Sequence, residues 1–144
     1  MSDGRKTLRK AEQAYRQLAA HYARAMDRNE PDRLDGVMTG DAVIDSVGVI
    51  IEGIDAIRAC PGMLRDMFLA TQHVVHNQTV TLLSDTEADG ETYCTASHIQ
   101  PPAADGQPHT ALVWAIRYQD TLRREDDTWR IGRASCRERV STIV

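Results

Sequence analysis

Residues 73–83, "HVVHNQTVTLL", decide whether this region is a helix or a strand, and with it the chemistry of two histidines. Three valines and two threonines fall within residues 73–81. Such β-branched side chains lose χ1 freedom in a helix but suit a pleated sheet, so a strand is predicted. A helix would place His73 and His76 on one face, where they could share a metal ion. A strand places His73 and Asn77 on one face and His76 on the other, so no metal site is predicted.

The segments after this strand have a similar composition, in which Val, Thr, Ile and Tyr are separated by turn residues. Their connections are of hairpin length, which predicts an antiparallel meander of long strands. The further strands are expected at residues 91–100, 109–125 and 129–132.

The first half of the chain is expected to be mostly helical. Between residues 6 and 28 the apolar residues recur at steps of three and four, which marks one face of a helix. A short helix is expected from Pro31 to about Val37, with Gly40 as a break after it. A Val- and Ile-rich hairpin and two short helices are then expected, at residues 41–53, 54–59 and 62–70. Helices followed by a curved sheet predict an α+β fold.

Composition limits the partners of the chain. Its 144 residues, 17 of them basic and 21 acidic, carry a formal charge of −4, so one domain and no nucleic-acid partner are expected. No apolar run matches a signal peptide or a membrane span, which predicts a soluble, cytoplasmic protein with no membrane partner. Cys60, Cys94 and Cys136 are far apart and odd in number, so neither a disulfide framework nor a zinc site is predicted.

Four stretches of the chain together resemble the SnoaL-like branch of the nuclear transport factor 2 superfamily, near scytalone dehydratase and hexachlorocyclohexane dehydrochlorinase. They are "HYARAMDRNEPDRLDGVMTGDAVID", "EGIDAIRA", "TQHVVHN" and "DDTWRIGR". The resemblance covers residues 11–132 and implies a cone, in which a strongly curved antiparallel sheet wraps around the helices and encloses an apolar pocket. The domain is therefore expected to span residues 1–132. Residues 133–144 form a divergent or non-native tail, to which no function is assigned.

The resemblance also implies a site. In those relatives a helix-end aspartate and a histidine form an acid/base pair, and in scytalone dehydratase a second histidine on the following strand joins them. Asp27, His73 and His98 match these positions. Where scytalone dehydratase has two tyrosines that hold a water molecule, Met26 and Ser46 stand here, so scytalone itself is not the expected substrate.

The strand pattern is consistent with this site. His98 and His73 lie at comparable distances from the turn predicted at residues 85–90, so their imidazoles are expected on neighbouring strands near one end of the sheet. The leading hypothesis is a lyase without a cofactor or metal. His73 removes a proton from an acidic carbon, Asp27 steadies the imidazolium, and His98 donates to a departing hydroxyl. The expected substrate is small and apolar, aromatic or polyketide-like. The expected pocket wall consists of Tyr22, Asn77, Trp114 and Tyr118.

Three alternatives remain open. An isomerase would use the same groups. A non-catalytic binding or dimerising module is the second, because one fold serves many functions. The third is a limonene-type epoxide hydrolase, for which Asp45, Arg117 and Asp120 offer the residue types, although alternation places Arg117 and Asp120 on opposite faces. An uncovered outer sheet face also makes a homodimer or a higher homo-oligomer the expected assembly.

Overall fold

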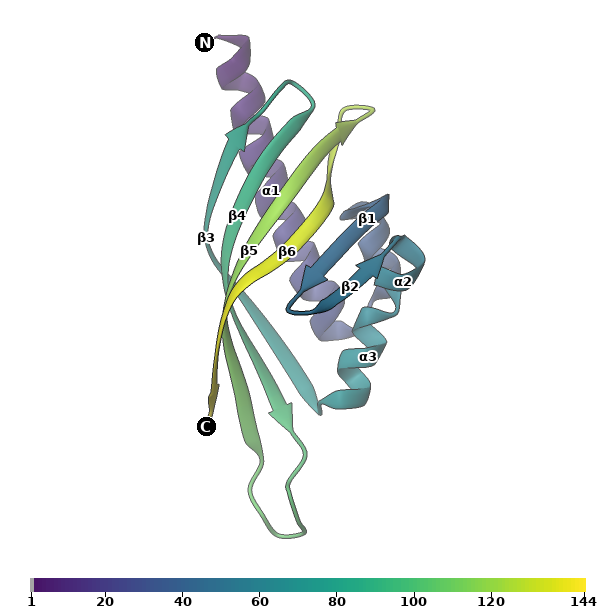
Figure 1. The fold of residues 1–144 in the computed structure, drawn as a ribbon, viewed down its shortest axis with the longest axis vertical. Coiled ribbons are helices and arrows are strands. Elements are labelled where there is room, and N and C mark those ends of the chain that lie inside the picture. Colours follow the sequence, from purple (N-terminus) through teal and green to yellow (C-terminus); the bar gives the residue numbers. More distant parts are fainter. Residues whose placement is uncertain (1) are drawn as a thin grey trace.

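The computed structural model describes residues 2–144, apart from the side chains of residues 138 and 139. Within these residues the strands form a six-stranded sheet with the order β2-β1-β6-β5-β4-β3 (Figure 1). Helix α1 crosses one face of this sheet, and the α+β class is confirmed. In chain order the elements are α1 (Asp3–Arg28), the 3-10 helix η1 (Pro31–Gly36), β1 (Met38–Ser46), β2 (Val49–Glu52), α2 (Ile54–Arg58), α3 (Cys60–Met67), β3 (Ala70–Leu82), β4 (Glu87–Gln100), β5 (Thr110–Glu125) and β6 (Thr128–Ile143).

Helix α1 is the predicted long helix and begins a few residues earlier, at Asp3. The Ser2 side chain caps it by accepting a hydrogen bond from the Arg5 amide at 3.4 Å. The apolar stripe found in the sequence is the buried face of the helix. The helix ends at Asn29, whose left-handed backbone (φ 52°) turns the chain away. Asp27 therefore stands in the last turn of α1.

The Val- and Ile-rich segment forms the predicted hairpin of β1 and β2, which turns at Val47 and Gly48, both with positive φ. The short helix expected to run to about Val37 is the 3-10 helix η1, which ends at Gly36, and Gly40 lies inside β1. β1 also pairs in parallel with β6, so the sheet is not antiparallel throughout. The chain reaches β6 only after the whole meander, so no hairpin sets the direction of this pair.

The two predicted short helices are α2 and α3, and they are separated at Ala59. Pro61 stands in the first turn of α3, where no intrahelical hydrogen bond from its nitrogen is needed. Helix α3 ends at Met67, before the predicted end at residue 70, because Phe68 is already extended (φ −132°, ψ 151°) and leads into β3.

Strand β3 contains a β-bulge that the regular alternation did not predict. Val75 and Gln78, three residues apart, pair with β4 residues that are only two apart. The extra residue reverses the alternation beyond Val75. Gln78 turns inward and is partly buried, whereas His76 and Asn77 are both exposed.

The strand predicted at residues 129–132 is the start of the much longer β6. This strand pairs with β5 as far as Ile143, opposite Leu112. Residues 133–143, which the sequence analysis assigned to a tail, thus continue the sheet.

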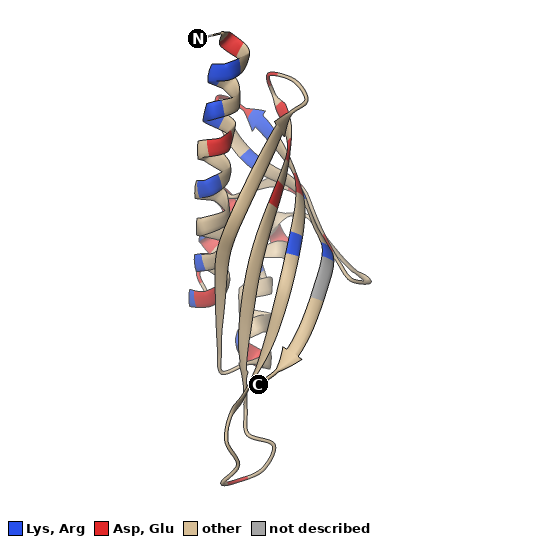
Figure 2. Cartoon of the chain, turned by 90° about the vertical axis from the view of Figure 1, so that its left-hand side faces the viewer, with Lys and Arg blue, Asp and Glu red and all other residues tan. Residues whose placement is uncertain are grey.

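The main core lies between α1 and the inner face of the sheet. Its fully buried members include Ala11, Tyr15, Leu34, Met38, Ile57 and Leu122. Basic residues, with fewer acidic residues among them, are spaced along α1 (Figure 2). Among residues 2–144, no helix combines the length and apolar character needed to cross a membrane.

Candidate active site

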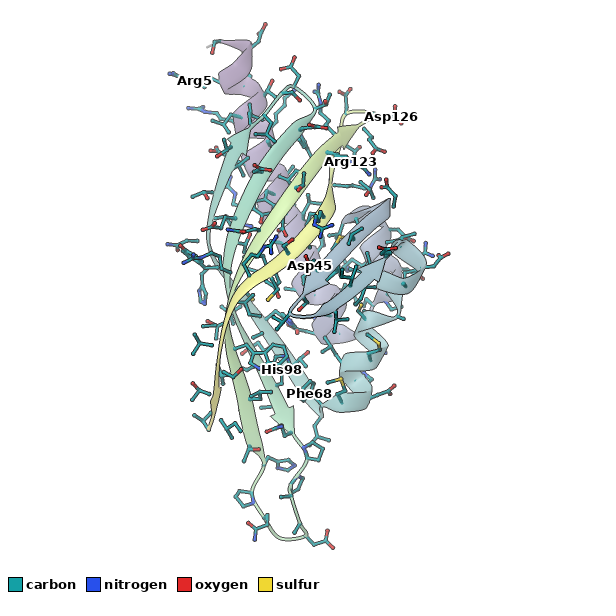
Figure 3. The ribbon with its side chains drawn as sticks, in the orientation of Figure 1. Arg5, Asp45, Phe68, His98, Arg123 and Asp126 are labelled. Carbon is teal, nitrogen blue, oxygen red and sulfur yellow. The ribbon has the colours of Figure 1, made fainter. Side chains whose placement is uncertain are left out.

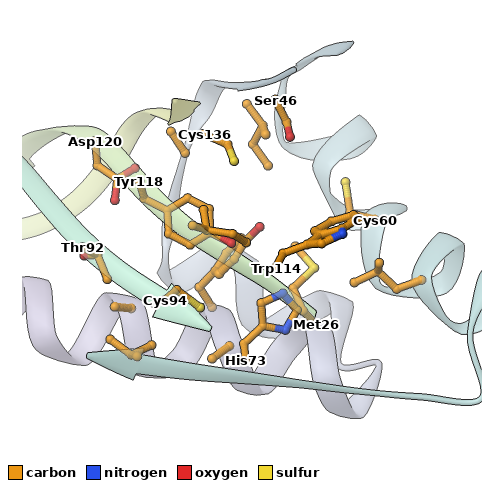
Figure 4. A pocket seen from close by; sticks show the side chains of 18 of the residues that line it. Met26, Ser46, Cys60, His73, Thr92, Cys94, Trp114, Tyr118, Asp120 and Cys136 are labelled. Atoms are coloured by element: carbon orange, nitrogen blue, oxygen red, sulfur yellow. The ribbon is translucent and has the colours of Figure 1, made fainter. Parts of the chain in front are cut away.

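A cavity opens between α1, α3 and the inner face of the sheet. Its empty volume, including the part continuous with solvent, is about 1190 Å³. Figure 4 shows side chains from helices and strands facing this space. Its walls are mostly apolar and include Met26, Leu64, Ile44, Val75, Ile116 and Ile131.

His73 lines this cavity, and its imidazole is hydrogen-bonded to Asp27. Asp27 Oδ1 accepts a hydrogen bond from His73 Nδ1 at 2.7 Å, and Asp27 Oδ2 accepts one from the His73 amide at 2.8 Å. Thr71, which lies on the same face of β3, donates its hydroxyl to Asp27 Oδ1 at 3.0 Å. The side chain of His73 is 7% exposed and that of Asp27 is 19% exposed. The end of α1 is thereby fixed to the start of β3.

This contact determines which nitrogen of His73 faces the cavity with a lone pair. Burial raises the pKa of Asp27, but the hydrogen bonds from the His73 side chain and amide outweigh it, so this pKa lies below its ordinary value. The carboxyl group is therefore ionised at neutral pH. A carboxylate only accepts hydrogen bonds, so Nδ1 of His73 carries the hydrogen and Nε2 of the neutral ring is left to accept a proton.

His98 lies beside His73 on the neighbouring strand. In the register of β3 and β4, His98 is opposite Thr71. The two imidazole centroids are 6.0 Å apart. His98 is only 1% exposed, and its Nδ1 donates to the Leu112 carbonyl at 3.1 Å. Its ring packs against Phe68 at 4.7 Å (Figure 3) and Trp114 at 4.3 Å.

Three of the four residues expected in the pocket wall line the cavity. They are Tyr22, Trp114 and Tyr118. The Tyr22 ring stands edge-on to His73 at 6.3 Å and to Tyr118 at 6.1 Å. Burial raises the pKa of both tyrosine hydroxyls well above the ordinary value, so both remain protonated and can donate hydrogen bonds.

The expected place of Asn77 in the wall is wrong. Asn77 is exposed and does not line the cavity. The β-bulge is the reason, because it gives β3 two consecutive exposed residues, His76 and Asn77. His76 points outward as predicted, and its Nε2 is 2.8 Å from the Thr95 hydroxyl on β4.

A second polar cluster, which was not predicted from the sequence, lies in the wall at Asp120 on β5. Tyr15 donates its hydroxyl to Asp120 Oδ2 at 2.6 Å, and Thr92 donates to the Tyr15 hydroxyl at 2.6 Å. Gln78, turned inward by the bulge, donates to Thr92 at 3.1 Å. Residues two apart on a strand share a face, so the position of Asp120 two residues after Tyr118 is the feature of the sequence that indicates an inward side chain.

The groups considered for an epoxide hydrolase are not brought together. Arg117 lies near the carboxylate of Glu91, at 3.8 Å, and against the ring of Tyr93, while Asp45 pairs with Arg133 at 3.0 Å. Asp120 faces the cavity and accepts its hydrogen bond from Tyr15 instead. Among the described residues, no group of three or more His, Cys, Asp or Glu side chains is arranged to hold a metal ion.

The three cysteines and the two positions that depart from scytalone dehydratase also line the cavity. Cys60, Cys94 and Cys136 are present as thiols. Burial raises the pKa of Cys94 to about 12, so this thiol is protonated at neutral pH. Met26 and Ser46 present a thioether and a hydroxyl in the same wall.

Comparison with known proteins finds the same architecture. A family model described as a SnoaL-like domain matches residues 9–135. An uncharacterized protein of Mycobacterium tuberculosis is 30% identical over 119 residues, which are 81% of this chain and 78% of that protein.

Two crystal structures share the fold at low identity. A hexachlorocyclohexane dehydrochlorinase has a TM-score of 0.80 and 18% identity, over 93% of this chain and 88% of that chain. A candidate scytalone dehydratase from Novosphingobium aromaticivorans has a TM-score of 0.79 and 22% identity, over 95% of this chain and 89% of that chain.

Proposed function

We propose that this chain, a member of the SnoaL-like domain family, is a lyase of the dehydratase type. It acts without a cofactor on a small, mainly apolar substrate, aromatic or polyketide-like, that enters the cavity. The family membership itself confirms the resemblance found in the sequence. The observation that carries this proposal is the Asp27–His73 pair, hydrogen-bonded at 2.7 Å at the wall of an apolar cavity. An aspartate exposed to solvent and far from an imidazole would instead have favoured a binding module.

The proposed step begins at His73. Its Nε2 takes a proton from a carbon that a neighbouring carbonyl or electron-poor ring makes acidic. The electrons of the broken C–H bond form a carbon–carbon double bond, and the C–O bond to a β-hydroxyl breaks. Asp27 stabilises the imidazolium through the hydrogen bond at Nδ1. Proton transfer by a positioned side chain contributes roughly 10²–10⁴-fold to the rate.

His98 is proposed as the group that protonates the departing oxygen. Because a carbonyl oxygen only accepts, the bond to Leu112 places one hydrogen on His98 Nδ1. The transferred proton therefore has to come from Nε2, and water leaves. The proton held by His73 then restores His98, whose ring centroid is 6.0 Å away.

Two relatives of similar fold have names that describe elimination chemistry, a dehydrochlorinase and a candidate dehydratase. Their identities to this chain are low, so their names support the reaction class and not the substrate. An isomerase is the second candidate, because Nε2 of His73 could return the same proton to another carbon of the substrate. It would need no departing group and no transfer from His98.

A screen of β-hydroxy-carbonyl and aromatic polyketide-like compounds tests the proposal. We expect turnover with loss of water, detected by mass spectrometry, and a drop of at least 10²-fold in His73→Ala. His76→Ala is the matched control, since it removes an imidazole from the outer face of the same strand, and should keep full activity.

The other outcomes assign the reaction differently. Product of unchanged mass, with His98→Ala still active, would identify an isomerase. Turnover that survives His73→Ala would refute the acid/base pair, and turnover abolished only by a chelator would indicate a metal.

A further inference from the structure

The cavity contains a carboxylate, Asp120, that has no part in the proposed reaction. Asp120 is 8% exposed and lies in the wall, on the same face of β5 as Trp114 and Tyr118. Its Oδ2 accepts the Tyr15 hydroxyl at 2.6 Å. Its Oδ1 is buried and has no hydrogen-bond partner among the described residues. Buried polar atoms are nearly always paired, so an unpaired carboxylate oxygen at a cavity wall marks a place for a ligand atom.

The side chains around Asp120 supply no further donor. Thr92 and Gln78 form a chain in which each group donates toward the next, from Gln78 to Thr92 and from Thr92 to Tyr15. This chain ends at Oδ2 of Asp120. Among the described residues no group donates a hydrogen bond to Oδ1, so a bound molecule can supply this donor.

Asp120 and His73 lie at different ends of the cavity wall, so a donor bound to Asp120 lies at the end of the ligand away from the reacting carbon. In the sheet register His73 is opposite Ala96, and Ala96 is opposite Trp114, whereas Asp120 is six residues further along β5. The rings of Tyr22 and Tyr118 fill the wall between the two ends, in contact with His73 and with each other at 6.3 and 6.1 Å. Figure 4 shows Tyr118 between Asp120 and His73.

We propose that Asp120 Oδ1 accepts a hydrogen bond from a ligand hydroxyl, carried at the end of the molecule remote from His73. This inference rests on the proposed function for the position of the reacting carbon, and it narrows the substrate class. The substrate is then a hydroxylated fused-ring compound whose apolar body lies along Tyr22 and Tyr118, with its acidic carbon at His73 and a hydroxyl at Asp120.

Binding of simple aromatic probes tests this inference without any turnover. The probes are 2-naphthol, naphthalene and 2-methoxynaphthalene, which has the oxygen but no hydrogen to donate. Burial raises the pKa of Asp120 to about 7, although the Tyr15 hydrogen bond opposes the shift. Calorimetry at about pH 8 therefore tests the ionised carboxylate. A hydrogen bond to a charged group is worth roughly 10- to 100-fold in affinity.

We expect wild-type protein to bind 2-naphthol at least tenfold more tightly than the other two probes. Asp120→Leu should abolish this preference and leave naphthalene binding unchanged. His73→Ala should keep it, which separates this inference from the proposed catalysis. Glu91→Gln is the matched control, because it removes a carboxylate from the outer face of β4 next to Thr92, and should also keep the preference.

Asp120→Asn covers the case in which Asp120→Leu does not fold. It keeps the shape and an acceptor for Tyr15 but removes the charge, so the preference for 2-naphthol should fall without a change for naphthalene. Three results would overturn the inference. They are no hydroxyl preference in wild type, a preference retained in the Asp120 variants, and a preference lost in His73→Ala.

Discussion

Asp27 accepts three hydrogen bonds with its two carboxylate oxygens, and all three come from strand β3. Two of them come from His73, through the side chain and the amide. One carboxylate therefore fixes the ring of His73, its tautomer and the position of the strand that carries it. A residue that acts on both structure and chemistry is best tested by a substitution that keeps its shape.

Asp27→Asn keeps the shape but removes the charge and places an amide donor near Nδ1 of His73. We expect the free energy of unfolding to fall by roughly 1.5–3 kcal/mol, because hydrogen bonds to a charged acceptor are lost. The tautomer of His73 should also shift, since Nδ1–H no longer faces a carboxylate. Urea unfolding and ¹⁵N spectra of the histidine rings measure the two effects.

Asp55→Asn is the control for this prediction. Asp55 pairs with Arg58 at 2.7 Å, but its side chain is 92% exposed, so its loss should change the free energy of unfolding by less than about 1 kcal/mol. Equal effects of the two substitutions, or an unchanged His73 tautomer in Asp27→Asn, would contradict the role given to Asp27.

At the scale of elements, the β-bulge in β3 determines which side chains reach the cavity. The β-branched residues within positions 73–83 were sufficient to predict a strand and to place His73 and His76 on opposite faces. It was not sufficient to predict the bulge, because the extra residue is defined by the pairing with β4, which lies far along the chain. Regular alternation therefore placed Asn77 inside and Gln78 outside, the reverse of what the structure has.

Deleting single residues tests the bulge. Without Asn77, residues 75, 76 and 78 would pair regularly with β4, and His73 and Gln78 would both still face inward. Without Thr79 the remaining residues would also pair regularly and keep His73, Val80 and Leu82 inside, but Asn77 would replace Gln78 opposite Thr92. We expect the Thr79 deletion to cost more, by roughly 1 kcal/mol, because the inward hydrogen bond from Gln78 to Thr92 is lost. Thermal unfolding compares the two, and a larger loss for the Asn77 deletion would refute the assignment.

Helix α1 and strand β4 approach closely at Gly90. A Cβ atom added there would lie 2.6 Å from the ring of Tyr15, whose hydroxyl is bound to Asp120. Gly90→Ala should therefore overpack the core and lower the free energy of unfolding by about 1–3 kcal/mol. At Gly62 in α3 an added Cβ meets nothing within 4 Å. Gly62→Ala should be neutral or stabilise the helix by up to about 1 kcal/mol, and denaturant unfolding distinguishes the two sites.

Local sequence patterns predicted most of the fold, whereas strand pairing between distant segments could not be predicted. Periodicity located the helices, the hairpin and the meander, and with them the α+β class. The parallel pair of β1 and β6 was not predictable, because turn residues define only neighbouring strands. The positions of Asp27, His73 and His98 came from the resemblance. Asp120 was considered only for an epoxide hydrolase, and its bond to Tyr15 depends on how α1 packs across the sheet.

Asp27 and Asp120 make the stability of the folded protein depend on pH in opposite directions. The folded-state pKa of Asp27 is lowered, so its contribution to stability is present above its ordinary pKa of 3.8 and is lost as the pH falls through the lower folded value. Burial raises the pKa of Asp120 to about 7. Its contribution is therefore fully present below 3.8 and is lost as the pH rises toward about 7. Together they favour a stability maximum in the mildly acidic range.

Urea unfolding between about pH 3 and pH 8 measures how the free energy of unfolding falls on each side of this maximum. The fall toward acid pH is the acid limb, and the fall toward neutral pH is the neutral limb. Asp120→Asn should flatten the decline between about pH 4 and pH 7, which in wild type is at most about 1.4 kcal/mol for each pH unit. Asp27→Asn should instead flatten the decline at acid pH and leave the neutral limb as it is. Because Asp120 lacks a partner for Oδ1, a bound 2-naphthol should weaken the neutral limb in wild type and not in Asp120→Asn. A neutral limb that persists unchanged in Asp120→Asn would show that another group causes it, and would remove the electrostatic reason for a ligand hydroxyl at that end of the cavity.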